Sequence, residues 1–96
     1  MTSKQRAYLS SLASKLPVVL QIGKAGLTPE LTEAVNEAFN TRELLKLAVL
    51  DNCGDDIRTL SEAVAARSRS EVVRTVGRKI ILYKRDRDKP KIELPC

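Results

Sequence analysis

At 96 residues the chain has room for one domain with one modest core, and a second domain is not expected. It contains no histidine and only two cysteines, far apart, so the usual zinc-binding sets and the nucleophile–imidazole pairs of many hydrolases are missing. The net charge of +5 is concentrated in residues 67–91, which hold ten basic and three acidic side chains, whereas the rest of the chain sums to −2. This asymmetry is typical of proteins that bind polyanions, although a face kept positive for solubility has the same composition.

Composition also bounds the location and chemistry. Cys53 and Cys96 have no CxxC spacing, no secretory segment is recognisable, and apolar runs such as residues 80–83 do not exceed four residues, which is too short to cross a bilayer. No serine or aspartate has a recognisable catalytic partner, and Glu43 and Asp51 are separated as chance pairs often are. We therefore expect a cytoplasmic, non-enzymatic protein with no cofactor, metal, membrane or small-molecule substrate.

The first predicted element is a helix. Thr2-Ser3-Lys4-Gln5 has the form of a capping box, and Pro17 ends the helix. Apolar residues form one stripe at helical spacing: Tyr8, Leu9, Leu12, Ala13 and Leu16. Three basic residues lie off this stripe: Lys4, Arg6 and Lys15.

A short apolar strand, residues 18–22, leads into a loop with the sequence Gly23-Lys24-Ala25-Gly26, called the GxxG loop below. Its two glycines permit backbone conformations that a side chain would forbid and allow close approach to a ligand. Thr28 and Pro29 are a predicted N-cap and first helical residue, so free amides and the positive end of a helix dipole lie behind the loop. With Lys24 at the tip, these features predict a phosphate-binding site; a tight turn that needs glycine for its shape alone is the alternative.

The remaining elements follow in alternation. Residues 28–41 predict a second helix with an acidic outer face, and residues 44–50 a strand covered on both sides and parallel to the first. A turn containing Cys53 precedes a third helix that closes at residues 68–70. Two strands, residues 71–76 and 79–84, flank Gly77-Arg78, the signal of a type II′ hairpin, and Tyr83 is predicted in the core.

The predicted order is thus α-β-α-β-α-β-β, which indicates an α/β fold: a compact two-layer or three-layer sandwich with a four-stranded mixed sheet and three helices. The strand order cannot be read from the sequence. Residues 1–84 form the predicted domain, and residues 85–96 a basic, proline-containing tail whose Ile92 and Leu94 could lie against a sheet edge.

Three stretches in this order, residues 20–29, 42–46 and 72–84, resemble the bacterial YhbY proteins, the stand-alone form of the CRM (chloroplast RNA splicing and ribosome maturation) domain. The opening helix is similar too. The resemblance implies a fold similar to the C-terminal domain of translation initiation factor three, RNA binding through the GxxG loop, and association with precursors of the large ribosomal subunit. Two residues depart from the family pattern: Arg42 replaces a histidine and Lys84 an arginine.

We accordingly predict an RNA-binding surface. Its core is the loop, residues Gly23, Lys24, Ala25 and Gly26 with Thr28, and it extends to Lys15, Lys4, Arg6, Arg67 and Arg69. Lys4, Arg6 and Lys15 are better explained one by one as ordinary solvated charges, and the sequence leaves open whether Arg67 and Arg69 lie beside the loop or far from it. The basic residues of the hairpin are also explained as protection of a sheet edge. The expected partner of a monomeric protein is RNA, either large-subunit ribosomal RNA or pre-ribosomal particles; the alternative is an adaptor that contacts ribosomal proteins rather than RNA.

Overall fold

The computed structural model describes residues 2–50, 56–85 and 92. The elements follow the predicted order: α1 (Ser3–Ala13), β1 (Leu20–Ile22), α2 (Pro29–Phe39), β2 (Leu44–Val49), α3 (Ile57–Ser68), β3 (Glu71–Val76) and β4 (Lys79–Tyr83). The predicted α/β fold is confirmed. The boundaries differ most at three places: α1 ends four residues before Pro17, β1 begins at Leu20 instead of residue 18, and α2 ends at Phe39 instead of residue 41.

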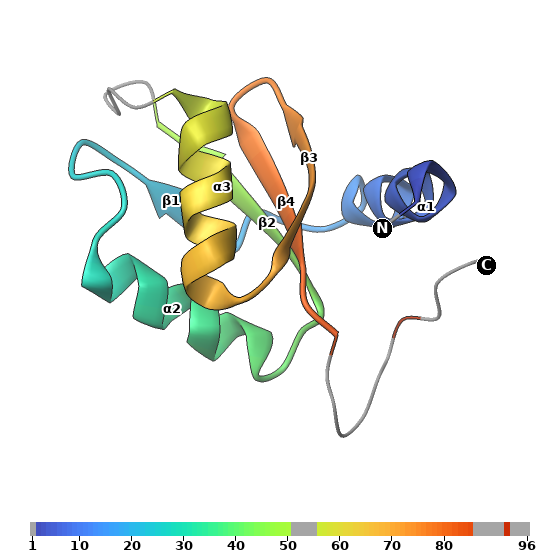
Figure 1. The fold of residues 1–96 in the computed structure, drawn as a ribbon, viewed down its shortest axis with the longest axis horizontal. Coiled ribbons are helices and arrows are strands. Elements are labelled where there is room, and N and C mark those ends of the chain that lie inside the picture. The colour runs from blue at the N-terminus through green and yellow to red at the C-terminus, as the bar shows by residue number, and fades with distance from the viewer. Residues whose placement is uncertain (1, 51–55, 86–91, 93–96) are drawn as a thin grey trace.

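The four strands form one mixed sheet in the order β1-β2-β4-β3. β1 pairs with β2 in parallel, as the strand–helix–strand order predicted, and β4 is antiparallel to both β2 and β3. Helices α2 and α3 cover one face of the sheet and α1 lies on the other, so the molecule has three layers (Figure 1). The carboxyl ends of β1 and β2 and the β3–β4 turn lie at the same end of the strands, since Ile22 pairs with Val49 and Lys79 with Ala48. We call this end of the sheet the loop edge, because the GxxG loop follows β1.

The ends of the helices are fixed by side chains that their sequences supply. Thr2 and Gln5 form the predicted capping box at α1. Thr28 caps α2, with Pro29 as its first residue, and Asp56 caps α3 through a hydrogen bond from the amide of Thr59 at 3.1 Å. Each cap satisfies an amide that would otherwise lack a partner and typically contributes about 1 kcal/mol.

The sheet has a buried cluster on each face. The larger cluster joins α2 and α3 to the sheet through residues such as Val35, Leu47 and Leu82. The smaller one joins α1 through Leu9 and Ala13, together with the partly buried Ile92. Tyr83 is buried in the smaller cluster, which confirms its predicted place in the core. Tyr8 was predicted on the buried stripe of α1, but it is 40% exposed, because the contact with the sheet is narrow.

Helix α1 covers only part of its face of the sheet. It contacts β2, β3 and β4, while Gln21 of β1 remains exposed. Lys46 and Ala48 are only half-buried, so the prediction that this strand is covered on both sides is wrong for its second half. The half of the face nearest the GxxG loop edge is therefore open.

Strand β3 carries a β-bulge between Val72 and Arg74. Val72 packs on the α2–α3 side of the sheet, but Val73 is buried against α1. Arg74 pairs with Ile81, which also faces α1, so two consecutive residues point to the same side. A regular strand would alternate and send Arg74 toward α3; the bulge redirects it to the open face.

Candidate nucleic-acid interface

The GxxG loop connects β1 to α2 at the edge where β1 and β2 end (Figure 1). The amide of Gly26 donates a hydrogen bond to the carbonyl of Gly23 at 3.0 Å, which closes a tight turn. Gly26 is buried with a φ of 66°, a left-handed conformation that a Cβ atom disfavours. Lys24 and Ala25 form the tip, and both are exposed. The turn therefore presents a lysine and main-chain groups to solvent.

The first glycine of the loop differs from the prediction. Among the described glycines only Gly26 and Gly77 have a positive φ, so the backbone conformation at Gly23 does not require glycine. The part of the prediction that rested on conformational freedom holds for Gly26 alone. Close approach of a ligand is the remaining reason for a glycine at position 23.

The helix end behind the loop offers fewer amides than predicted. Pro29 has no N–H group, and the amide of Leu31 donates to Oγ1 of Thr28 at 3.1 Å. In the first turn this leaves the amide of Glu30, whose own exposed carboxylate opposes a bound anion. The helix thus contributes its dipole more than its hydrogen-bond donors, and the donors for a phosphate must come from the turn itself.

Arg78 lies at the same edge as the loop. Its Nε donates to the carbonyl of Val49 at 3.2 Å and its Nη2 to that of Leu50 at 2.9 Å. The amide of Leu50 in turn donates to the carbonyl of Ile22, the residue before Gly23, at 2.8 Å. The guanidinium group is therefore fixed beside the strand end that leads into the loop.

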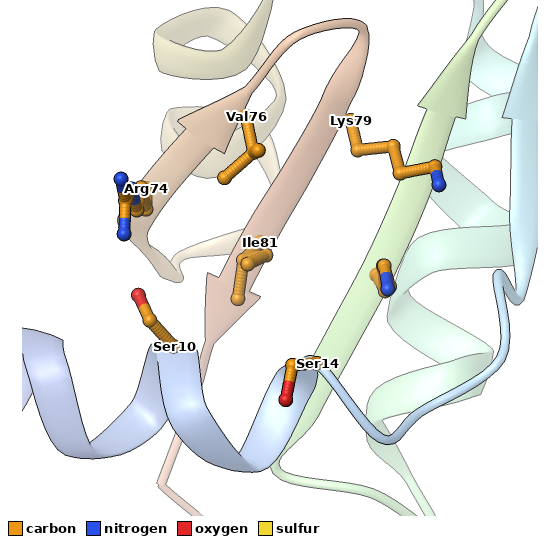
Figure 2. Close-up of a pocket in the computed structure, with 7 residues that line it drawn as sticks. Ser10, Ser14, Arg74, Val76, Lys79 and Ile81 are labelled. Carbon is orange, nitrogen blue, oxygen red and sulfur yellow. The ribbon is translucent and has the colours of Figure 1, made fainter.

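A cleft of about 330 Å³ opens on the uncovered half of the sheet beside α1 (Figure 2). Ser10 and Ser14 of α1 form one wall; the Ser10 hydroxyl points toward the strands, whereas the Ser14 hydroxyl donates to the carbonyl of Ser11 at 2.7 Å. The remaining lining side chains are three cations and two apolar residues: Lys46, Arg74 and Lys79, with Val76 and Ile81. We call this feature the cationic cleft. None of its lining residues is acidic.

Comparison with known proteins identifies the family. A family model of the CRS1 / YhbY (CRM) domain matches residues 1–84. The chain belongs to this CRM domain family. The likeness to YhbY proteins expected from the three sequence stretches is confirmed.

Individual relatives of this CRM domain match over nearly its full length. The chain is 40% identical over 95 residues to the "Probable RNA-binding protein YqeI" of Bacillus subtilis, which covers 99% of each protein. It is 30% identical to an "RNA-binding protein" of Haemophilus influenzae, covering 99% of this chain and 95% of that protein. The solution structure of the hypothetical protein SAV1595 from Staphylococcus aureus matches with a TM-score of 0.84 at 37% identity, covering 99% of each chain. None of these names is that of an enzyme.

The predicted site residues of this CRM domain do not form one cluster. Lys4 and Arg6 lie on the first turns of α1, on the opposite side of the molecule from the GxxG loop (Figure 1). Arg6 is also engaged in the fold, because its guanidinium donates to the carbonyls of Val72 and Val73 at the bulge. Its contact with the bulge gives Arg6 a structural role that the sequence did not indicate.

The other flanking residues are also away from the loop. Helix α3 begins at the loop edge (Figure 1), and its 12 residues make it about 18 Å long. Arg67 and Arg69 lie at its other end and are therefore far from the loop. Lys15 follows the end of α1 and is not among the residues that line the cationic cleft. Both Arg67 and Arg69 are exposed, as is Lys15. Of the predicted set, the structure brings together residues 23–28 only.

The predicted site leaves out four basic residues that the fold gathers near the loop edge: Arg74, Arg78 and Lys79, which the sequence reasoning interprets as protection of a sheet edge, and Lys46, which it does not consider. One signal was available, because Lys46 is the single charged residue in an otherwise apolar strand. Lys46 Nζ contacts the carbonyls of Ala13 and Leu16 at 3.5 Å, where it neutralises the end of α1. The direction of the Arg74 side chain depends on the β-bulge, and no sequence pattern indicates that bulge.

The opposite edge of the sheet has a different character. Glu43 is buried, and its Oε1 accepts a hydrogen bond from the amide of Ile92 at 2.7 Å. Burial, and secondarily the carboxylate of Glu43, raise the pKa of the nearby Tyr83, with a smaller raising effect of Glu71 and a lowering effect of Arg85. The hydrogen bond from the Ile92 amide to Glu43, with the packing of Ile92 on the smaller cluster, holds residue 92 against the core.

Other classes of site receive no support from the described ranges. Within residues 2–50, 56–85 and 92, no group of three or more histidine, cysteine, aspartate or glutamate side chains could hold a metal ion. In the same part of the chain, no helix has the length and apolar character needed to cross a membrane. Cys53, Asp51 and most of the tail lie outside the described residues.

Proposed function

We propose that this CRM domain binds RNA through the GxxG loop and acts on precursors of the large ribosomal subunit. Binding through the GxxG loop is supported by the geometry of its turn. Lys24 is exposed on a backbone that the hydrogen bond between Gly26 and Gly23 closes, and the turn lies at the N-terminus of α2. The RNA-binding names of the relatives supply independent support. The ribosomal half rests on the family likeness.

The expected contact is with the RNA backbone. Main-chain amides and an ammonium group recognise phosphate oxygens but not base identity. Such a grip should bind many sequences with similar affinity, and the affinity should fall steeply with salt, with a slope near −0.7 per phosphate contact for single strands. Weak dependence on salt, with binding to ribosomal proteins in place of RNA, would favour the adaptor alternative.

The central prediction concerns Lys24→Glu. Because Lys24 is exposed, the variant should keep the thermal stability of the parent, but RNA affinity should fall at least tenfold, or about 1.4 kcal/mol. Fluorescence anisotropy with a labelled structured RNA at low salt measures the change.

Arg42→Glu is the matched control. Arg42 is exposed between α2 and β2, at the edge opposite the loop, and the change in net charge is the same. Equal losses in the two variants would show that total charge and not the loop governs binding. An unchanged affinity of the Lys24 variant would count against the loop as the grip.

A further inference from the structure

The cationic cleft is a second site that differs in chemistry from the GxxG loop. Its three cations come from three strands, β2, β3 and β4. Lys46 is partly engaged by α1 carbonyls, but in the described part of the chain no side-chain hydrogen bond or ion pair involves Arg74 or Lys79. Three like charges around one concave surface concentrate a positive potential there. The cleft is therefore suited to an anion.

The surroundings strengthen the field. The acidic residues of α2 lie on an exposed helix face on the far side of the sheet, and Glu43 and Glu71 lie toward the edge opposite the loop. None of these carboxylates lines the cleft. The three cations thus lack any nearby acid, among the described residues, that lines the same cavity and could neutralise them.

The apolar floor indicates what the anion is attached to. Val76 is 48% exposed, and it lies beside Ile81. A phosphate alone needs no apolar contact, whereas a ribonucleotide has a flat base that covers such a surface. A volume of about 330 Å³ lies at the low end of small-molecule sites and is far too small for a double helix.

The position of the cleft links it to the loop. Gln21, Ala48, Lys79 and Val76 are paired in one row across the sheet. With strands about 4.8 Å apart, the row places Lys79 about 10 Å from Gln21, which is two residues before Gly23. One RNA strand can therefore reach the loop and the cleft together.

We propose that the cationic cleft binds one unpaired nucleotide of the RNA, with its phosphate on Arg74 and Lys79 and its base on Val76 and Ile81. The inference rests on the proposed RNA binding, and it adds a preference: RNA with a bulged or looped-out nucleotide binds better than a continuous duplex. The hydroxyl of Ser10 lies on the opposite wall and points toward the strands.

The main test compares a double variant, Arg74→Gln with Lys79→Gln, with a control that removes the same charge from two exposed residues elsewhere, Arg42→Gln with Arg85→Gln. The probes are an RNA hairpin with a single-nucleotide bulge and the same hairpin without it. We expect the cleft variant to lose at least tenfold in affinity for the bulged hairpin and to lower the salt slope by about 0.7, the value for one phosphate contact. The control should keep both the bulge preference and most of the slope.

A second variant separates the base from the phosphate. Val76→Ser removes apolar contact at an exposed position without changing charge, so it should reduce the preference for the bulge and leave the salt slope unchanged. Two-dimensional amide NMR of the parent protein should show RNA-induced shifts at Lys79 and Ile81 as well as at Lys24 and Ala25.

The outcomes distinguish the two proposals. Shifts at Lys24 with none at Lys79, together with an unchanged affinity of the cleft variant, would overturn the cleft and leave the loop in place. Equal affinity of the parent for the bulged and unbulged hairpins would also overturn it. Absence of any RNA binding by the parent protein would refute the proposed function itself.

Discussion

At the scale of single residues, the conformation of Gly26 is the feature on which the loop depends. It is buried at a φ of 66°, where an L-residue pays about 1–2 kcal/mol of backbone strain. Gly23, by contrast, has an ordinary backbone conformation. The sequence pattern treats the two glycines alike, but the structure assigns them different roles.

This difference leads to a prediction for Gly26→Val. The variant should lose about 2 kcal/mol in the free energy of unfolding, from strain at positive φ and the stiffness of a β-branched residue, and its RNA affinity should fall further than that of the Lys24 variant. Urea denaturation followed by circular dichroism measures the first effect. Gly23→Ala serves as the control and should be destabilised less; equal stability losses would show that the loop geometry described here is wrong.

Tyr83 gives a prediction for the dependence of stability on pH. Burial is the main reason why the pKa of Tyr83 is raised above its usual value in the folded protein, so folding favours the neutral phenol. The associated stability is fully present below pH 10 and is lost as pH rises through the folded-state pKa. The free energy of unfolding of Tyr83→Phe should therefore decline less between pH 10 and 11 than that of the parent, in urea titrations at each pH; parallel declines would contradict the assignment.

At the scale of elements, the bulge in β3 affects both the packing of α1 and the direction of the Arg74 side chain. Arg6 of α1 donates to the carbonyls of Val72 and Val73 at the bulge, and Val73 fills the space beneath α1. The extra residue shifts the side-chain alternation, so Arg74 lines the cleft. Arg6 is thus a positioning residue for the open face.

The corresponding prediction concerns Arg6→Ala. Loss of the two hydrogen bonds should lower the free energy of unfolding by about 1 kcal/mol, because the carbonyls lie near solvent and regain water. It should also shift the amide NMR signals of Arg74 and Ile81 in the free protein. Lys4→Ala, an exposed change on the same helix, is the control; unchanged signals in the Arg6 variant would mean that the bulge is stable without it.

At the scale of the whole molecule, the sequence predicted the order and type of all seven elements, because periodicity, capping residues and the Gly77-Arg78 turn are local signals. It also placed Thr28 and Tyr83 correctly. The strand order β1-β2-β4-β3 and the incomplete cover by α1 depend on contacts between distant segments, which local patterns do not encode. The gathering of Lys46, Arg74 and Lys79 in one cleft follows from both, and so the sequence alone could not reveal it.

The two edge strands of the sheet, β1 and β3, have a further consequence. β1 has only three residues, and at β3 the bulge interrupts the regular pattern while Arg6 occupies two carbonyls. An incoming strand from another copy would find too few main-chain groups in register on either side. The fold therefore resists the addition of a strand from another copy, even though the mixed sheet lies close to the molecular surface.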